Sequence, residues 1–209
     1  MKGGGNTVIY IFEQPDRLDL EAAMPLLPAD RAEKVKRFRF DKDKKRSAAA
    51  WLLLRLALRR EYGTAEPGEF TFGEHGKPFL AGHPEVFFSL SHCKEAVICA
   101  LSDSEVGADA QELSEPSPGM EKRIFSPAEA EAMRTAEDKA LFFTAVWTGK
   151  EAELKRRGTG ITESLRETDT LSLDNLAVFC RDGYVISAAG DGAREARTVQ
   201  VSLEELIDG

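Results

Sequence analysis

The sequence has few cysteines, no long uninterrupted apolar run and no excess of positive charge. Its three cysteines, Cys93, Cys99 and Cys180, are odd in number and far apart in a chain of 209 residues. This argues against a disulfide framework and against a zinc site of recognisable spacing, and it is typical of a reducing compartment. The net charge of −8 argues against a general nucleic-acid-binding role.

The apolar segments are too short for insertion into a membrane. The most apolar one, from Ala48 to Leu58, is interrupted by Arg55 and is far shorter than a bilayer-spanning helix. Near the N-terminus, the apolar run Val8–Phe12 is followed by Glu13 and is too short for the core of a secretory signal. We therefore expect a cytoplasmic protein with neither nucleic acid nor membrane as a partner.

Apolar and β-branched runs alternate with helical patterns along the whole chain. Strands are predicted at about residues 8–12, 70–72, 86–91, 96–101, 106–112, 176–180, 184–188 and 198–202. Helices are predicted at about 29–40, 41–62, from 126 onward and from 138 to 158. The helix at 41–62 is apolar almost all round, which predicts burial at the centre of a domain. The pattern indicates an α+β fold with helices packed on antiparallel sheet, and the three strands between 86 and 112 predict a meander.

A basic segment runs from Arg31 to Arg46, against the overall charge of the chain. It holds nine Lys or Arg and three acids, so it is locally +6 within a chain of net charge −8. A segment of opposite sign can concentrate an anionic ligand, although most charge runs simply form a solvated face. The pattern alone leaves both interpretations open.

The helix predicted to end at Gly158 places charges within and beside its apolar arc. That arc consists of Phe143, Val146, Trp147 and Leu154. Lys150 falls inside the arc, and a buried charge there needs a partner. Glu151 and Lys155 lie along its edge with i, i+4 spacing, so they can form an ion pair. By spacing alone, a surface salt bridge with a snorkelling lysine stem is the favoured interpretation.

The strand predicted at 106–112, with sequence VGADAQE, carries an acid among small residues. Aspartate is disfavoured within strands, which makes Asp109 a candidate functional residue. Because strand residues alternate between faces, Asp109 and Gln111 point the same way and Glu112 points the other.

Four segments, in this order, resemble the 4′-phosphopantetheinyl transferase superfamily, in its longer, surfactin-synthetase-activating subclass. They are Gly76-Lys77-Pro78, Phe88–His92, Val106–Asp109 and Trp147–Lys155, and the flanks Phe125-Ser126 with Glu129 and Gly158–Gly160 agree. The resemblance covers about residues 31–161. Each motif alone is common, whereas the ordered set is specific.

The resemblance implies transfer of 4′-phosphopantetheine from coenzyme A to a serine hydroxyl of an apo acyl or peptidyl carrier protein, with release of adenosine 3′,5′-bisphosphate. The pathway, fatty acid, polyketide or nonribosomal peptide, stays open. A Mg²⁺ ion with oxygen ligands would neutralise the pyrophosphate, and the implied ligands are Asp109, Gln111 and Glu151. Glu151 is the implied base for the serine hydroxyl, and Lys155 the implied catalytic cation.

The resemblance also implies how coenzyme A and the carrier are bound. The implied coenzyme A positions are Lys34, Arg46, Lys77, Pro78, Ser91, His92, Lys150 and Lys155. Carrier proteins of this kind are generally acidic, so the segment Arg31–Arg46 could serve the carrier, coenzyme A or both. The subclass implies a monomer with two similar halves in pseudo-twofold arrangement, residues 1–103 and 104–209, and an active site between them.

Gln111 is the main departure from the family pattern, because the strand often carries a glutamate there. A glutamine offers a carbonyl oxygen without charge, and Glu112 cannot replace it unless the strand bulges. An alternative is therefore a non-catalytic relative that binds coenzyme A or a carrier without transfer. Asp109, Glu151 and Lys155 favour the transferase over this relative. A third interpretation, an unrelated α+β protein with a phosphate-binding face, would require the four ordered motifs to occur by chance. A Cys-His nucleophile from His92 and Cys93 is rejected, because neighbours on an extended segment point apart.

Overall fold

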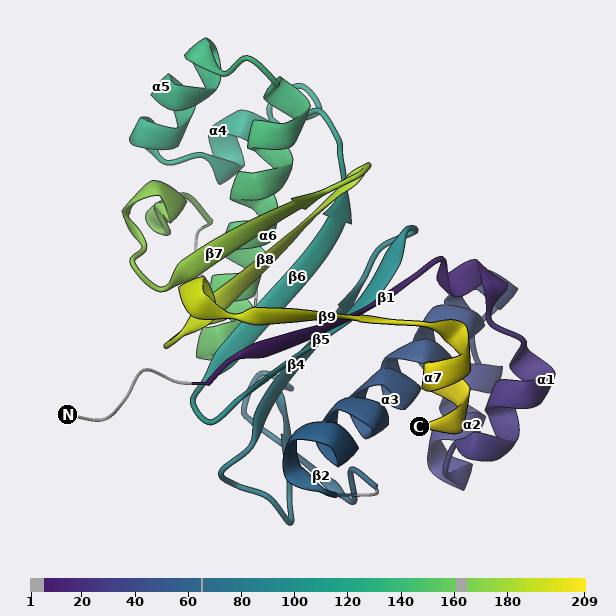
Figure 1. Cartoon of the computed structure of the whole chain (residues 1–209). Helices are drawn as coiled ribbons and strands as arrows, with labels where there is room; N and C mark the ends of the chain where they lie inside the picture. Colours follow the sequence, from purple (N-terminus) through teal and green to yellow (C-terminus); the bar gives the residue numbers. More distant parts are fainter. Residues whose placement is uncertain (1–5, 65, 161–164) are drawn as a thin grey trace.

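The computed structural model describes residues 6–64, 66–160 and 165–209. Besides a small two-stranded sheet, these residues form two larger sheets with one long helix against each (Figure 1). Ile161, at the end of the predicted motif region, lies outside the described residues. The first sheet has the order β4-β5-β1-β9, with β1 Val8–Glu13, β4 Phe87–His92, β5 Ala96–Ser102 and β9 Arg197–Val201. The second has the order β6-β8-β7, with β6 Val106–Glu112, β7 Leu176–Arg181 and β8 Tyr184–Gly190. The predicted α+β class is confirmed.

The remaining elements are shorter or lie outside the two sheets. The hairpin β2-β3 consists of Phe70–Phe72 and Pro78–Leu80. The longer helices are α2 Ala29–Lys36, α3 Asp41–Tyr62, α5 Pro127–Thr135 and α6 Lys139–Arg157. The short helices are η1 Pro15–Arg17, α1 Leu20–Ala23, η2 Met24–Leu26, α4 Met120–Ile124, η4 Leu165–Glu167, η5 Thr170–Ser172, η6 Ala193–Glu195 and α7 Leu203–Asp208. In the described residues, no helix has the length and apolar character needed to cross a membrane.

Helix α3 covers one face of the first sheet, as Figure 1 shows. Its apolar middle, from Ala48 to Leu58, is almost entirely buried, and it packs with side chains of β1, β4 and β5 in one core cluster. The predicted central, buried helix is therefore confirmed. Its basic N-terminal turns stay nearer the surface, since Lys42 is exposed and Lys44 and Lys45 are only partly buried.

Helix α6 packs closely against β6 and β8 of the second sheet, and two glycines make the close approach possible. A Cβ atom on Gly107 would lie 2.0 Å from the carbonyl oxygen of Ala152 and 2.3 Å from the amide nitrogen of Arg156. A Cβ atom on Gly149 would lie 3.0 Å from the Leu176 side chain. The mid-helix Gly149 therefore has a packing reason that offsets its low helix propensity.

Replacing Gly107 by alanine should push α6 away from β6. Because the Cβ atom would meet backbone rather than a movable side chain, we expect the free energy of unfolding to fall by roughly 1–3 kcal/mol. Urea denaturation measures this loss. Gly82→Ala is the matched control, because a Cβ atom there meets nothing within 4 Å. Equal stabilities of the two variants would contradict the close contact.

The predicted meander is only partly present. Strands β4 and β5 pair as antiparallel neighbours, but β6 leaves this sheet and pairs with β8. Serine side chains of β4 bind the free edge of β6 in place of a backbone ladder: Ser89 Oγ accepts from the Ala108 amide at 2.9 Å, and Ser91 Oγ accepts from the Ala110 amide at 3.3 Å. The two sheets therefore meet edge to edge, at β4 and β6.

Strand β9, near the end of the described residues, pairs with β1, near their beginning. After β7 and β8 have completed the second sheet, β9 lies parallel to β1 at the edge of the first sheet (Figure 1). Glu61 of α3 fastens this junction, because its Oε1 accepts from the Tyr10 hydroxyl at 2.6 Å and contacts Arg197 at 2.7 Å. Residues 104–209 thus contribute strands to both sheets.

Candidate active site

The candidate site lies where β4, β6 and α6 meet, and a shared carboxylate oxygen is at its centre. Asp109 Oδ1 accepts from Lys155 Nζ at 2.6 Å and from Ser91 Oγ at 2.6 Å. Lys155 Nζ also donates to the Ala108 carbonyl at 3.1 Å. Ser91, predicted to contact coenzyme A, thus orients Asp109 in this structure. Sequence reasoning missed this second role, because it depends on the β4–β6 contact.

Glu151 lies one helical turn before Lys155 and has an unsatisfied carboxylate oxygen. Its Oε1 is buried and has no hydrogen-bond partner among the described residues. Burial, and next the negative charge of Asp109, raises the pKa of Glu151, while the charge of Lys155 lowers it. A buried carboxylate oxygen without a partner is costly unless a proton or a cation satisfies it. The residues therefore fit a hard divalent cation between Glu151 and Asp109.

Among the described residues, no third acidic side chain joins Asp109 and Glu151 in a metal-binding group. No group of three or more His, Cys, Asp or Glu side chains that could hold a metal occurs within the described part of the chain. A third protein ligand must therefore be a neutral oxygen, and Gln111 is the predicted source. Strand β6 pairs regularly with β8 from Val106 to Glu112, without a bulge, so Glu112 stays on the opposite face as expected.

Gln111 occupies the face of β6 that α6 covers. Gly107 and Asp109 share this face by alternation, and both contact α6 near residues 152–156. Beyond Gln111, the Ser114 amide donates to Thr144 Oγ1 at 3.0 Å, so strand and helix run in opposite directions. Gln111 therefore lies between these two contacts, along the stretch of α6 that carries Glu151.

Positive groups surround the rim near His92, which is at the end of β4. Partial burial and the positive charges of Arg46 and Lys155 lower the pKa of His92, which favours its neutral form. Arg46 is mostly buried, with loose ion pairs to Asp16 at 3.9 Å and to Asp43 at 3.7 Å. Its buried Nε has no partner among the described residues. The structure thus brings Arg46, His92 and Lys155 into one electrostatic neighbourhood.

Lys77 and Pro78 line a pocket of about 270 Å³ beside the catalytic candidates. Its wall consists of His75–Pro78, Phe88–Leu90, Glu151, Leu154, Lys155, Gly158 and Gly160. Lys77 Nζ donates to the Arg156 carbonyl at the end of α6, at 2.5 Å, and burial lowers its pKa. The loop that carries the GKP motif is therefore fastened to the helix that carries Glu151.

Lys34 lines a larger cleft of about 1170 Å³, which shares Gly76, Pro78 and Leu90 with the smaller pocket. In this cleft the Arg31 guanidinium lies over the rings of Trp51, at 4.6 Å, and Phe70, at 5.1 Å. The buried Trp51 Nε1 has no hydrogen-bond partner among the described residues. Sequence reasoning missed Trp51 and Phe70, because both fell within apolar runs that predicted only core.

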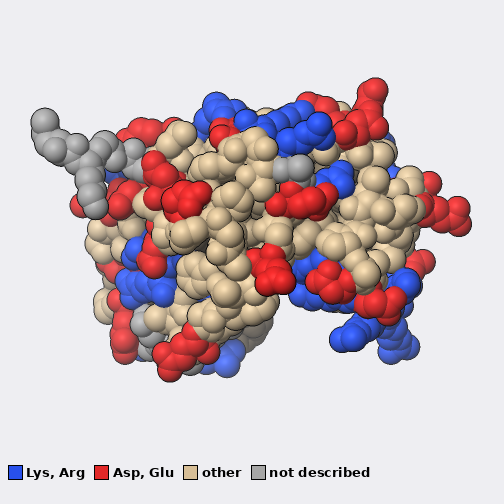
Figure 2. Space-filling model, turned by 90° about the horizontal axis from the view of Figure 1, so that it is seen from below, with Lys and Arg blue, Asp and Glu red and all other residues tan. Residues whose placement is uncertain are grey.

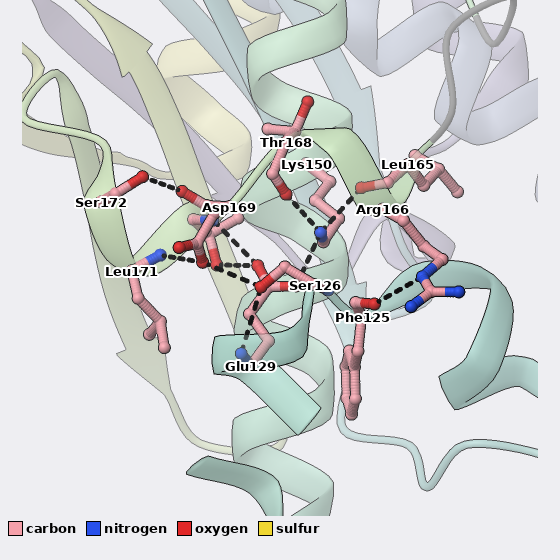
Figure 3. A network of polar contacts seen from close by, with 11 residues as sticks. Phe125, Ser126, Glu129, Lys150, Leu165, Arg166, Thr168, Asp169, Leu171 and Ser172 are labelled. Atoms are coloured by element: carbon pink, nitrogen blue, oxygen red, sulfur yellow. Dashed lines mark hydrogen bonds and ion pairs between the residues drawn. The ribbon is translucent and has the colours of Figure 1, made fainter. Parts of the chain in front are cut away.

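Lys150 is not in this site, so its predicted contact with coenzyme A is wrong. Its side chain is fully buried and pairs with the equally buried Glu129 Oε2 at 2.7 Å. Lys150 Nζ also donates to the Leu165 carbonyl at 2.7 Å and to the Thr168 carbonyl (Figure 3). The physical reason is helix geometry: consecutive residues point about 100° apart, so Glu151 faces β6 while Lys150 faces α5.

Glu129 joins Lys150 to the surrounding segments. Its Oε2 accepts from the Ser126 amide at 2.7 Å (Figure 3). Its Oε1 accepts from the amide and the hydroxyl of Thr170, both at 2.8 Å. Ser126 and Glu129 form a capping box at the start of α5, where the sequence predicts a helix from residue 126 onward. The sequence pattern indicates the cap because Ser126 and Glu129 are three residues apart. It does not indicate the ion pair, because Lys150 lies on another helix.

Two family models and several curated proteins match this chain. A model described as 4′-phosphopantetheinyl transferase superfamily matches residues 105–195, and one described as 4′-phosphopantetheinyl transferase, N-terminal, matches residues 14–104. A 4′-phosphopantetheinyl transferase of Bacillus subtilis is 29% identical over 174 residues, which cover 81% of this chain and 74% of the relative. The protein psf-1 of Bacillus pumilus, with the same description, is 31% identical over 169 residues, covering 78% and 72%. A putative member from Synechocystis is 30% identical over 173 residues, covering 78% and 69%.

Proposed function

The chain belongs to the 4′-phosphopantetheinyl transferase superfamily, in its two-half type, and we propose that Asp109, Glu151 and Lys155 form its catalytic centre. It is a 4′-phosphopantetheinyl transferase, which moves phosphopantetheine from coenzyme A to a carrier protein. The observation that carries the site assignment is the buried Glu151 Oε1, which has no partner in the described part of the chain and lies next to the Asp109–Lys155 pair. We further propose that residues 1–103 and 104–209 are the two halves, with β9 returning to the first sheet.

We propose Mg²⁺ as the cofactor, held by Asp109, Glu151 and the carbonyl oxygen of Gln111. When bound, this ion would neutralise the pyrophosphate of coenzyme A and so favour attack on it. The Glu151 oxygen without a partner among the described residues and the raised pKa of Glu151 support the proposal, because a divalent cation would satisfy this oxygen and favour the charged carboxylate.

The protein residues have distinct parts in the transfer. The serine hydroxyl of the carrier attacks the phosphorus that bears the pantetheine arm, and its proton goes to Glu151. The bond from this phosphorus to the oxygen of the leaving adenosine 3′,5′-bisphosphate breaks. Lys155, which pairs with Asp109, stabilises the charge that develops on the phosphate oxygens.

We propose that coenzyme A lies along the two adjoining pockets. The smaller pocket, with Lys77, Pro78 and Lys155, takes the pyrophosphate end next to Glu151. The larger cleft, with Lys34, takes the nucleotide end, and Arg46 and His92 contribute at the rim. The positive groups of this region match the negative charges of three phosphate groups.

We propose an acidic carrier protein in the cytoplasm as the partner, and neither nucleic acid nor membrane. Figure 2 shows acidic side chains spread over much of one face, with Lys and Arg gathered in a few groups. The basic segment Arg31–Arg46 covers α2 and the start of α3, so an acidic partner complements it. Cys93, Cys99 and Cys180 are all free thiols, which supports a reducing compartment.

The purified protein should convert an apo carrier protein to its phosphopantetheine-bearing form. With coenzyme A and Mg²⁺, intact mass spectrometry should show the carrier gain one phosphopantetheine group, and excess chelator should prevent the gain. A panel of apo acyl and peptidyl carriers also identifies the preferred partner. Unchanged masses across the whole panel would instead support a relative that binds without transfer.

A further inference from the structure

The amide of Gln111 is held in one orientation by its neighbour in the chain. Gln111 Nε2 donates to Glu112 Oε2 at 3.2 Å. An ionised carboxylate can only accept hydrogen bonds, so the amide group must turn its NH₂ towards Glu112. The carbonyl oxygen of Gln111 is therefore the atom that remains for another partner.

Glu112 is itself fixed from the first sheet. Its Oε1 accepts from the backbone amide of Lys94, in the turn between β4 and β5. The ammonium group of Lys94 is paired elsewhere, with Glu95 at 3.1 Å. Glu112 is thus anchored by a backbone donor whose position depends on the fold, and its second oxygen stays available for Gln111.

We propose that Glu112 is a positioning residue, which fixes the Gln111 amide so that its carbonyl oxygen rather than its NH₂ meets the cation held by Asp109 and Glu151. The inference rests on the metal site proposed above and extends it by one residue. Outer hydrogen-bond partners of this kind orient the ligands of metal sites and tune their affinity.

The pairing also explains why a neutral side chain stands at position 111. A glutamate there would place a second carboxylate within hydrogen-bond distance of Glu112, where like charges repel. A glutamine removes the repulsion and adds a hydrogen bond, while its carbonyl remains a hard oxygen ligand. Gln111 and Glu112 therefore act as a matched pair.

A double-variant cycle tests this coupling by direct metal binding. Mn²⁺ replaces Mg²⁺ as the probe, with coenzyme A present and carrier absent, and electron paramagnetic resonance measures free Mn²⁺. In Glu112→Gln, the new NH₂ attracts the Gln111 carbonyl, so the Gln111 NH₂ turns towards the cation. The Mn²⁺ dissociation constant should rise roughly 10–100-fold.

Glu112→Gln should strengthen rather than weaken Mn²⁺ binding when position 111 carries a glutamate. Gln111→Glu should still bind Mn²⁺, because the added ligand charge offsets the repulsion by Glu112. Adding Glu112→Gln removes that repulsion and donates to the new carboxylate, so the double variant should bind more tightly than Gln111→Glu alone. Glu95→Gln, which removes a nearby charge of the same sign, is the control and should bind as the parent does.

Asp109→Asn separates failure of the inference from failure of the site. If this variant binds Mn²⁺ as the parent does, the proposed metal site is wrong. If it loses binding while Glu112→Gln does not, Glu112 has no positioning role. Equal weakening by Glu112→Gln in both backgrounds would also overturn the proposal, since it would indicate a general loss of negative charge.

Discussion

Replacing Glu151 by glutamine should nearly abolish transfer while leaving the protein as stable as the parent or more so. The variant lacks both the proton acceptor and one charged ligand, and loss of general-base catalysis alone costs about 10²–10⁴-fold in rate. Stability should not fall, because Glu151 is partly buried, its buried Oε1 has no partner among the described residues, and the negative charge of Asp109 acts on it. Removing such a charge relieves a desolvation penalty.

The combination of an inactive and well-folded variant is the specific part of this expectation. Single-turnover rates, obtained from carrier masses, measure the loss of transfer. Urea denaturation curves measure the stability of the variant. Glu153→Gln on the same helix is the matched control: Glu153 is buried and accepts from both Arg156 and Arg157, so its loss should reduce stability while catalysis persists. A Glu151→Gln enzyme with the parental rate would refute both the base and the ligand assignment.

Replacing Glu129 by alanine should lower the free energy of unfolding by about 3–5 kcal/mol, because the partner ammonium stays buried without its counter-charge. Lys150 and Glu129 have no exposed side-chain surface, so water cannot take the place of the missing carboxylate. Urea denaturation measures the loss. The slope of the unfolding free energy against urea concentration should stay as in the parent protein.

An exposed ion pair and an apolar replacement provide the comparisons. Glu33 and Lys36 form a pair at 2.7 Å whose side chains are 62% and 61% exposed, so Glu33→Ala should cost at most about 1 kcal/mol. Glu129→Leu combined with Lys150→Met should recover much of the loss, because packed apolar side chains can replace a buried pair. If Glu129→Ala costs no more than Glu33→Ala, the ion pair does not stabilise the fold.

The parts predicted correctly from the sequence were those that depend on local pattern. The all-round apolar run of α3 specified a buried central helix, and Ser126 with Glu129 specified the start of α5. The site pair of Asp109 and Lys155 came from motif order, and the structure brings the two within hydrogen-bond distance. Their roles in catalysis and in binding the cation remain predictions.

The parts that were missed depend on contacts between distant segments. Lys150 was assigned to the phosphates because its true partner, Glu129, lies on another helix, where a capping pattern already accounted for it. Strand β6 was expected beside β5 because short turns favour a meander, yet its partner β8 comes more than seventy residues later in the chain. The stacking of Arg31 on Trp51 and Phe70 joins α2, α3 and β2, which no local spacing reveals.

The return of β9 to the first sheet affects how the chain is made. During translation, β1 is synthesised long before β9, so the neighbour on one of its sides is absent until residues 197–201 have left the ribosome. Until then one edge of β1 keeps its backbone donors and acceptors unpaired, a state that favours pairing with other chains. The first sheet therefore cannot be completed while residues 1–103 are being synthesised, and this edge of β1 stays open until β9 emerges.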